Sequence, residues 1–244
     1  MYAVIAAGGS IDGAYAARAG TRLKALAPVR GRTMLARTID ALRACGLERI
    51  AVVGNDAIRD ECERVATVAM VPDAGTGAGN VLGALDVWPD DAPLLYLTCD
   101  LPFVDARSLQ WVLDRIEPST LSMPLAEHAA FVRRFPGAPP FGITLAGERV
   151  VNAGVFHIPA GARARIRAFA TTMFEARKAP WMMASVAGPL VLLQFAFGRA
   201  SIGALERRAR NLLAMPVTAL RDAPPELAFD ADSDPEYVYA LAHD

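Results

Sequence analysis

A Gly-Gly-Ser loop that follows a short apolar run is the feature of this sequence most suited to chemistry, because two basic residues come soon after it. These residues are Gly8, Gly9, Ser10, Arg18 and Lys24. Glycine lets the backbone approach a ligand closely and turn its N–H groups towards oxygen atoms. The Arg and Lys side chains add positive charge. The combination predicts a phosphate-binding loop.

The spacing in this loop excludes two common nucleotide fingerprints. Neither GxGxxG, typical of dinucleotide binding, nor the P-loop pattern GxxxxGK[ST] is present. Two glycines alone also suit a plain tight turn, and two basic residues alone suit a solvated loop. Their occurrence together in one loop favours phosphate binding.

A carboxylate, Asp100, stands at the end of a later apolar run. Burying it is costly unless a cation, a helix N-terminus or an arginine compensates its charge. Mg²⁺ takes one or two protein carboxylates together with phosphate oxygens, and Asp230, Asp232 and Asp234 are candidates for a second ligand. We expect Asp234 to cap the last helix. In a strand, Asp230 and Asp232 would point to one face.

Two further segments carry candidate binding residues. Gly75 and Thr76 lie in a second glycine-rich loop, which is either a flexible connection or a wall for a flat base. Asn80 either reads a base edge or caps the helix that follows. Asn152 and Gly154 are candidates for binding an acceptor, because glycine in a strand often marks close approach of a ligand; an ordinary turn is the alternative.

An alternation of strands and helices must position these residues. In the first half we expect strands at 2–7, 50–54, 66–71 and 93–98, and helices at 33–45, 56–64, 79–88 and 105–116. This order predicts a mostly parallel α/β sheet with ligands at the carboxyl ends of its strands. In the second half we expect strands at 119–124, 215–220 and 227–230, an antiparallel pair at 141–145 and 150–158, helices at 161–176 and 201–213, and a last helix opening at Asp234.

Composition limits the classes of binding partner and the cellular compartment that we expect for this protein. The chain has 244 residues, is 53% hydrophobic and has a net charge of −1, so no basic field exists for nucleic acid. The first apolar run lacks the length and basic segment of a signal peptide. Cys45, Cys62 and Cys99 form no CxxC pair, which favours the reducing cytoplasm. The apolar stretch 181–198 is short for a membrane span, so we expect a buried core helix or a homodimer contact.

Taken together, these motifs resemble the MobA-like nucleotidyltransferases, which have a Rossmann-like, GT-A-type sheet. The resemblance spans nearly the whole chain and its motifs occur in family order. It is carried by Ala6-Ala7-Gly8-Gly9, Arg18, Gly20, Lys24-Ala25-Leu26, Gly31, Gly75-Thr76-Gly77, the run from Leu97 to Pro102, and the run from Asp230 to Glu236.

The resemblance implies a single domain over 1–244, with a nucleotide-binding half (1–118) and an acceptor-side half (119–244). It implies transfer of a nucleoside monophosphate from a triphosphate to a small phosphorylated acceptor, with release of pyrophosphate. Lys24 and Arg18 would neutralise the triphosphate, and Asp100 and Asp232 would hold Mg²⁺. Residues implied to bind nucleotide are Ala6, Ala7, Gly8, Gly9, Ser10, Lys24, Gly75, Thr76 and Asn80.

The sequence departs from the family pattern in two places. Residues 11–17 make the loop before Arg18 longer than usual, and the closing acidic motif carries an extra residue, which makes Asp232 the better second metal ligand and Asp230 the fallback. A GT-A glycosyltransferase that uses a nucleotide sugar, or a non-catalytic nucleotide-binding module, is the alternative. The glycosyltransferase would want Asp-x-Asp where this chain has Cys99-Asp100, and Lys24 would have no task in it.

Overall fold

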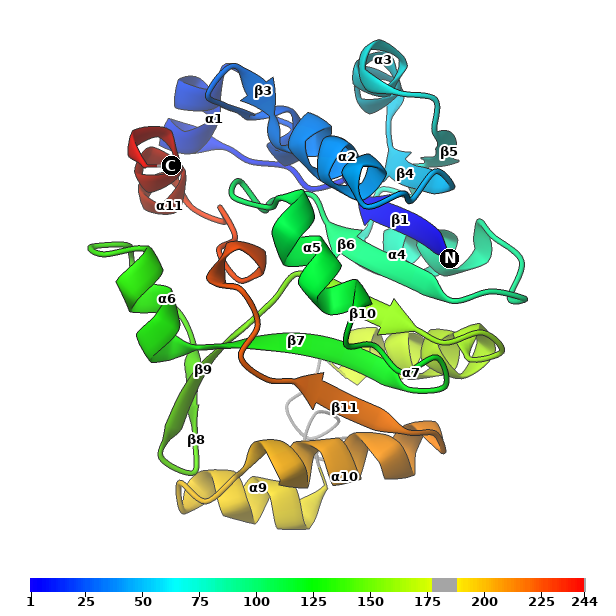
Figure 1. Ribbon diagram of the computed structural model, residues 1–244, viewed down its shortest axis with the longest axis vertical. Helices are drawn as coiled ribbons and strands as arrows, with labels where there is room; N and C mark the ends of the chain where they lie inside the picture. Colours follow the sequence, from blue (N-terminus) through cyan, green and yellow to red (C-terminus); the bar gives the residue numbers. More distant parts are fainter. Residues whose placement is uncertain (177–187, 244) are drawn as a thin grey trace.

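A nine-stranded sheet runs through the centre of the molecule (Figure 1). The structure is a computed structural model that describes residues 1–176 and 188–243. The strands are β1 (Tyr2–Ala6), β4 (Ile50–Gly54), β5 (Ala69–Pro72), β6 (Leu94–Thr98), β7 (Leu121–Glu127), β8 (Ile143–Leu145), β9 (Glu148–Asn152), β10 (Val155–Ile158) and β11 (Val217–Leu220). Their order is β5-β4-β1-β6-β10-β7-β9-β8, and β11 pairs with β7. Because β9 and β10 oppose the other described strands, the sheet is mixed but mostly parallel.

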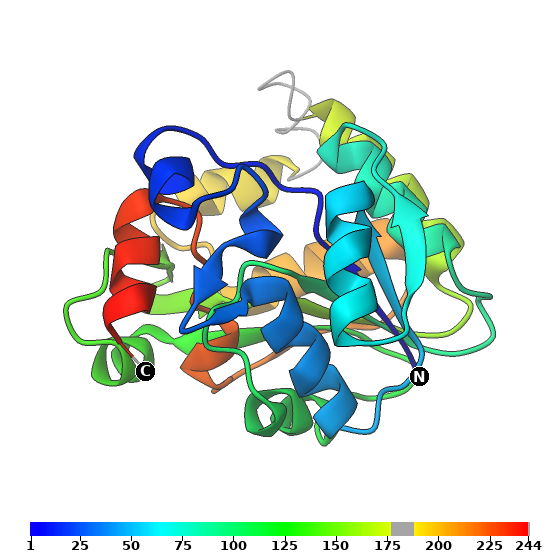
Figure 2. The same cartoon turned by 90° about the horizontal axis from the view of Figure 1, so that it is seen from above.

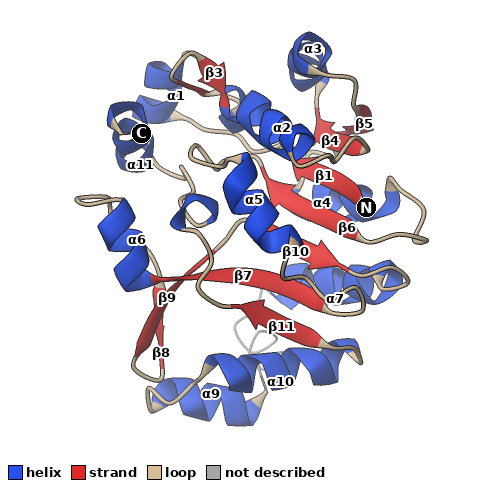
Figure 3. Ribbon diagram, in the orientation of Figure 1, coloured by secondary structure: helices blue, strands red, loops and turns tan. Residues whose placement is uncertain are grey.

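Helices flank this sheet on both faces, as the prediction of a Rossmann-like fold required. Figure 3 shows α2 (Met34–Ala44) and α5 (Ala106–Leu113) in front of the sheet, and α4 (Gly77–Asp86) and α7 (Arg163–Ala176) behind it. The other described helices are α1 (Gly13–Ala19), α3 (Asp56–Val65), α6 (His128–Arg134), α9 (Pro189–Ala196), α10 (Ile202–Leu213) and α11 (Asp234–Ala242), and the short 3-10 turns are η1 (Lys24–Leu26) and η2 (Pro225–Leu227).

Strand β1 is apolar throughout because both of its faces are covered. Ile5 packs into the cluster that includes Leu35 of α2, whereas Val4 packs into the cluster with Leu85 of α4. Side chains of a strand alternate between faces, so a strand buried on both sides needs a continuous apolar run. This burial fixes the direction in which β1 delivers the glycine loop.

Side-chain caps set the start of several predicted helices. Thr33 precedes α2, and its Oγ1 accepts a hydrogen bond from the backbone N–H of Ala36 at 3.1 Å. Asp105 caps α5 as predicted, accepting from Ser108 N–H at 2.8 Å. A capped first turn satisfies N–H groups that have no partner within the helix.

The structure corrects several expected elements. The expected strand 150–158 is two strands, β9 and β10, because the chain crosses from one sheet neighbour to another at Ala153 and Gly154. Residues 227–230 form no strand, since η2 ends at Leu227 and an irregular segment follows. Helices α1 and α6 were not expected, because short helices have a weak periodic signal.

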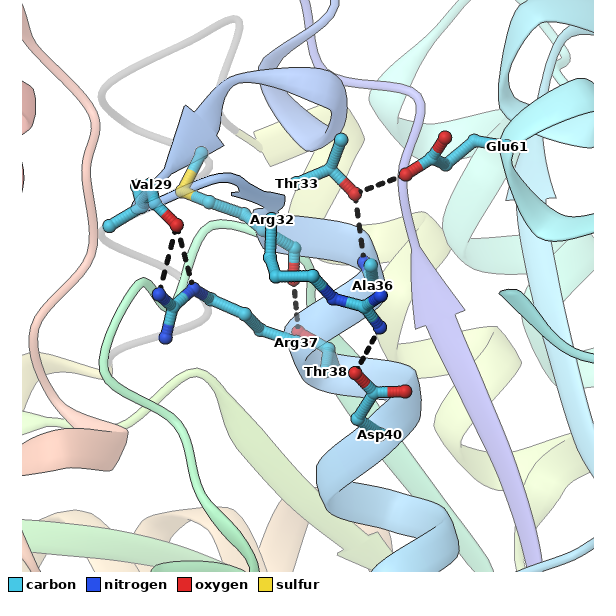
Figure 4. A network of polar contacts seen from close by, with 9 residues as sticks. Val29, Arg32, Thr33, Ala36, Arg37, Thr38, Asp40 and Glu61 are labelled. Carbon is cyan, nitrogen blue, oxygen red and sulfur yellow. Dashed lines mark hydrogen bonds and ion pairs between the residues drawn. The ribbon is translucent and has the colours of Figure 1, made fainter. Parts of the chain in front are cut away.

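A small hairpin follows the Lys24 loop and anchors it to α2 (Figure 4). Strands β2 (Pro28–Val29) and β3 (Arg32–Thr33) pair across a turn in which Gly31 has a φ of +75°, a conformation that favours glycine. The guanidinium of Arg37 donates two hydrogen bonds to the carbonyl of Val29, at 2.9 and 3.1 Å. The hydroxyl of Thr33 donates to Glu61 of α3 at 2.6 Å, so three elements are tied together.

Only part of the apolar stretch 181–198 can be compared with its prediction, because residues 181–187 lie outside the described residues. Within α9, Leu190 is 66% exposed and Leu193 is 56% exposed. The described part is therefore no buried core helix, and a homodimer contact stays a prediction. Among the described helices, none has the length and apolar character needed to cross a membrane.

Candidate active site

The glycine loop, residues 8–10, leaves the carboxyl end of β1 and returns alongside itself. The backbone N–H of Lys24 donates to Gly9 C=O at 3.0 Å, and Ser10 pairs with Leu23 as an antiparallel bridge. The residues between Ser10 and Leu23, which include α1, form an excursion that begins and ends at this bridge. The bridge and the hydrogen bond therefore hold the Lys24 backbone directly beside the glycine loop.

Asn80 lies against the glycine loop from the other side. Its Oδ1 accepts a hydrogen bond from the backbone N–H of Ala74 at 2.8 Å. A Cβ added to Gly8 would lie 2.4 Å from Asn80 Nδ2, so a side chain there would displace Asn80. Thr76, not Asn80, caps α4 by accepting from Gly79 N–H at 3.1 Å. Asn80 therefore joins the two glycine-rich loops, and its contact with a nucleotide stays a prediction.

Lys24 stands between two carboxylates at the carboxyl edge of the sheet. Its Nζ is 2.6 Å from Asp100 Oδ2 and also contacts Asp232 Oδ1. The Lys24 and Asp100 side chains are 12% and 15% exposed, whereas Asp232 is 63% exposed. Burial lowers the pKa of Lys24, but the charges and hydrogen bonds of the two carboxylates outweigh it and raise the pKa overall. Lys24 therefore stays charged.

The same cluster contains more negative than positive charge. Asp230 lies close enough that burial, followed by the charges of Asp232 and Asp100, raises its pKa to about 7. Asp100 Oδ1 is buried and has no hydrogen-bond partner among the described residues. Asp100 and Asp232 thus share the ammonium of Lys24, Asp230 lies within reach of their charges, and Asp100 Oδ1 has an unused lone pair. This arrangement fits a divalent cation.

The cluster does not by itself form a complete metal cage. Within residues 1–176 and 188–243, no group of three or more acidic, histidine or cysteine side chains is arranged to hold a metal ion. Mg²⁺ usually completes its octahedron with water and substrate phosphates around one or two carboxylates. The residues present therefore fit a magnesium ion that binds together with a nucleotide.

Arg18 forms an ion pair with the acidic end of the chain. It is in the last turn of α1, and its Nε donates to Asp234 Oδ1 at 3.0 Å. The prediction that Asp234 caps α11 is wrong. Ser233 occupies the N-cap position and forms a capping box with Glu236. Asp234, the first residue of α11, instead pairs with Arg18. A contact between Arg18 and a triphosphate stays a prediction.

Sequence reasoning gave no role to two residues beside this cluster. A hollow of about 470 Å³ opens next to the glycine loop, and Tyr15 and Arg22 line it together with Ser10 and Asp232. Arg22 stands two residues before Lys24, a spacing that could have drawn attention to it. No sequence signal distinguishes Tyr15, because its contacts are with the other end of the chain.

The predicted acceptor residues lie on the second half of the sheet. A Cβ on Gly154 would lie 2.3 Å from Thr98 Oγ1 on β6, so a protein contact accounts for this glycine. Asn152 is exposed and lines an apolar cavity of about 180 Å³ between the sheet and α10. Binding of an acceptor by either residue stays a prediction.

The fold is that of a nucleotidyltransferase. The chain belongs to the MobA-like NTP transferase domain family, which matches residues 3–186. Among curated relatives, bifunctional protein GlmU of Cupriavidus taiwanensis is 38% identical over 92 residues, which is 36% of this chain and 20% of the relative. The chain thus aligns with about a fifth of that protein's length.

Solved structures agree with the fold over almost the entire chain. A hypothetical transferase from Thermus thermophilus superimposes with a TM-score of 0.82 at 28% identity, covering 97% of this chain and 98% of that one. A 4-diphosphocytidyl-2C-methyl-D-erythritol synthase from Anaerococcus prevotii gives a TM-score of 0.59 at 13% identity, covering 99% and 96%. The second likeness is evidence of a shared fold alone.

Proposed function

We propose that this protein transfers a nucleoside monophosphate from a nucleoside triphosphate to a small phosphorylated acceptor and releases pyrophosphate. The observation that carries the proposal is the contact of Lys24 with Asp100 and Asp232 beside the glycine loop. An ammonium held next to exposed backbone N–H groups suits a triphosphate, and a carboxylate with an unused buried oxygen suits the cation that accompanies it.

In this mechanism the protein contributes position and charge. The glycine loop receives the phosphates, and Lys24 neutralises charge that develops on the oxygens around the α-phosphorus. Asp100 and Asp232 would hold Mg²⁺, with Asp230 as the alternative second ligand; the ion would supply further charge neutralisation when bound. The acceptor phosphate attacks in line, the bond from the α-phosphorus to the bridging oxygen breaks, and that oxygen leaves with pyrophosphate.

We propose that the two halves of the chain bind different substrates. Residues 1–118 would bind the nucleotide and residues 119–244 the acceptor, within one domain, because β10 of the second half inserts between β6 and β7 of a continuous sheet. We also propose the cytoplasm as the compartment, since Cys45, Cys62 and Cys99 are all free thiols.

Thermal unfolding with each of ATP, CTP, GTP and UTP, with and without Mg²⁺, tests the proposal. A ligand that binds only the folded state raises Tm, and at 100 times Kd the gain is about 2.7 kcal/mol, or roughly 5–10 °C for a chain of this size. We expect one preferred nucleotide, a shift that needs Mg²⁺, and its loss in Asp100→Ala.

The matched control is Asp56→Ala, because the Asp56 side chain is 99% exposed on α3. This variant should keep the full shift. Pyrophosphate release, measured with the preferred nucleotide and a panel of sugar and polyol phosphates, then tests transfer itself. No shift with any triphosphate, or an undiminished shift in Asp100→Ala, would contradict the proposal.

A further inference from the structure

The acidic segment, residues 230–232, has no regular secondary structure to hold it in place. The segment follows η2 after two intervening residues and ends where Ser233 caps α11. Its central residue, Ala231, is fully buried and makes the backbone contacts that hold it. Ala231 N–H donates to the carbonyl of Asp100 at 2.9 Å, which ties the segment to the end of β6.

The carbonyl group of Ala231 is held by Tyr15 of α1. Tyr15 Oη donates a hydrogen bond to Ala231 C=O at 3.0 Å, across 216 positions of sequence. The Tyr15 ring stacks on Tyr237 of α11, with centroids 4.6 Å apart and an interplanar angle of 26°. Burial raises the pKa of Tyr15, so its hydroxyl stays protonated and able to donate.

These contacts join the two ends of the chain at the acid cluster. Figure 2 shows α1 lying beside α11, and the outer edge of this contact is the ion pair between Arg18 and Asp234. Because α1 is part of the excursion that begins at Ser10 and returns at Leu23, Tyr15 links the glycine loop to the acidic segment.

We infer that Tyr15 is a positioning residue for metal-assisted nucleotidyl transfer: its hydroxyl holds the acidic segment so that Asp230 and Asp232 stay beside Asp100 and Lys24. The inference rests on the proposed function. Tyr15 contacts no reacting atom in this role; it acts through the Ala231 peptide. The lengthened segment 11–17, much of which forms α1, then supplies the residue that holds the acidic segment.

Tyr15→Phe tests the inference because it removes the hydroxyl and keeps the ring. Tyr239→Phe is the matched control: Tyr239 is also buried and donates to a backbone carbonyl outside the acidic segment, that of Pro136 at 3.1 Å, and the variant keeps its ring stacked on Phe229. Hydrogen exchange of peptides covering residues 229–234 is measured first, without metal or nucleotide. We expect exchange about five-fold faster in Tyr15→Phe, as for the loss of one hydrogen bond, and no change in Tyr239→Phe.

Mn²⁺ binding to the whole protein with nucleotide, followed by electron paramagnetic resonance, is the second readout. We expect about five-fold weaker Mn²⁺ binding in Tyr15→Phe and wild-type binding in Tyr239→Phe. In turnover assays the Mg²⁺ activation constant should rise by a similar factor. The KM for nucleotide at saturating Mg²⁺ should stay within two-fold, a split that a general loss of stability would not produce.

The outcomes separate the two proposals. Wild-type exchange or wild-type Mn²⁺ affinity in Tyr15→Phe overturns the positioning role and leaves the proposed function standing. Equal effects in Tyr239→Phe also overturn it, because the cause would then be general destabilisation. If the wild-type protein binds no Mn²⁺ and releases no pyrophosphate from any triphosphate, the proposed function fails and the positioning role falls with it.

Discussion

At the scale of single residues, the unusual feature is one lysine shared by an acidic cluster. Lys24 contacts Asp100 and Asp232, while burial, followed by the charges of Asp232 and Asp100, raises the pKa of Asp230. Such a cluster is costly for stability, since partly buried charges lose hydration. A nucleotide with its cation would neutralise it, so the same residues that cost stability are suited to bind substrate.

Lys24→Ala should lower turnover by a factor on the order of 10²–10³, because a positioned charge near the transferring phosphate is removed. The variant should also have a lower Tm, since Asp100 and Asp232 lose their partner, yet stay folded at 25 °C. Steady-state kinetics and circular dichroism measure both. Arg59→Ala, which removes an exposed cation on α3, should match wild type. Wild-type turnover in Lys24→Ala would remove the lysine from the mechanism.

At the scale of elements, the contact between β6 and β10 sets the position of Asp100. Thr98 N–H donates to Gly154 C=O at 2.9 Å, two residues before the carboxylate. Gly154 has no room for a side chain, because a Cβ would also lie 3.1 Å from Leu101. Thr98 and Leu101, which lie on either side of Asp100 in the sequence, are therefore both packed against this one glycine.

Gly154→Ala should destabilise the protein by about 1–3 kcal/mol, as overpacking does, and should weaken Mn²⁺ binding by displacing Asp100. Urea unfolding and Mn²⁺ titration measure the two effects. Gly203→Ala is the control. A Cβ added to Gly203, in α10, would lie 3.6 Å from its nearest neighbour, and alanine there should stabilise the protein by about 0.5–1 kcal/mol. A Gly154→Ala protein as stable as wild type would contradict the packing argument.

Strand β10 also buries a histidine whose charge the fold disfavours. His157 is fully buried, its Nδ1 lies 2.9 Å from Thr120 C=O, and Nε2 has no partner among the described residues. The carbonyl can only accept, so Nδ1 carries the proton in the neutral ring. Burial lowers the pKa of His157 below its usual 6.5. The folded state therefore binds fewer protons than the unfolded state as the pH falls.

The contribution of His157 to the free energy of unfolding should consequently fall as the pH drops from 7 towards 5, with a slope of up to about 1.4 kcal/mol per pH unit. The raised pKa of Asp230 gives a slope of opposite sign over the same range. The His157 contribution is therefore the difference in slope between wild type and His157→Gln, and only the wild type should have it. Equal slopes in wild type and His157→Gln, measured by urea unfolding across pH, would contradict this account.

At the scale of the whole molecule, an aromatic cluster joins distant segments around the acidic segment. Phe229, directly before Asp230, is fully buried and contacts aromatic rings from the loop before α5, from α6 and from α11. Its ring lies 4.9 Å from Phe103 and 5.5 Å from Tyr239, between centroids. The cluster therefore anchors the start of the acidic segment, next to Asp230.

Phe229→Ala should cost about 3–5 kcal/mol, the usual range for emptying a buried aromatic site. For a chain of this size the loss corresponds to a fall in Tm of roughly 6–20 °C. Phe197→Ala, at a ring that is 69% exposed after α9, should change stability by less than about 0.5 kcal/mol. Calorimetry compares the two, and similar Tm values would show that the cluster is not a principal anchor.

The sequence by itself determined the parallel half of the sheet, the capped helices α2 and α5, the glycine loop and the family. These features rest on local patterns: apolar runs buried on both faces, cap residues and glycines next to basic residues. Lys24 and Asp100 were predicted as site residues for the same reason, although their contact was not.

Only the tertiary structure decided which groups meet. The pairing of Arg18 with Asp234, the hydrogen bond from Tyr15 to Ala231 and the contact of Lys24 with Asp232 each join residues more than 200 positions apart. The break between β9 and β10 and the irregular acidic segment likewise follow from packing against β6, α6 and α11. Local propensity carries no information on such contacts, because they form only when the two ends of the chain are brought to the same edge of the sheet.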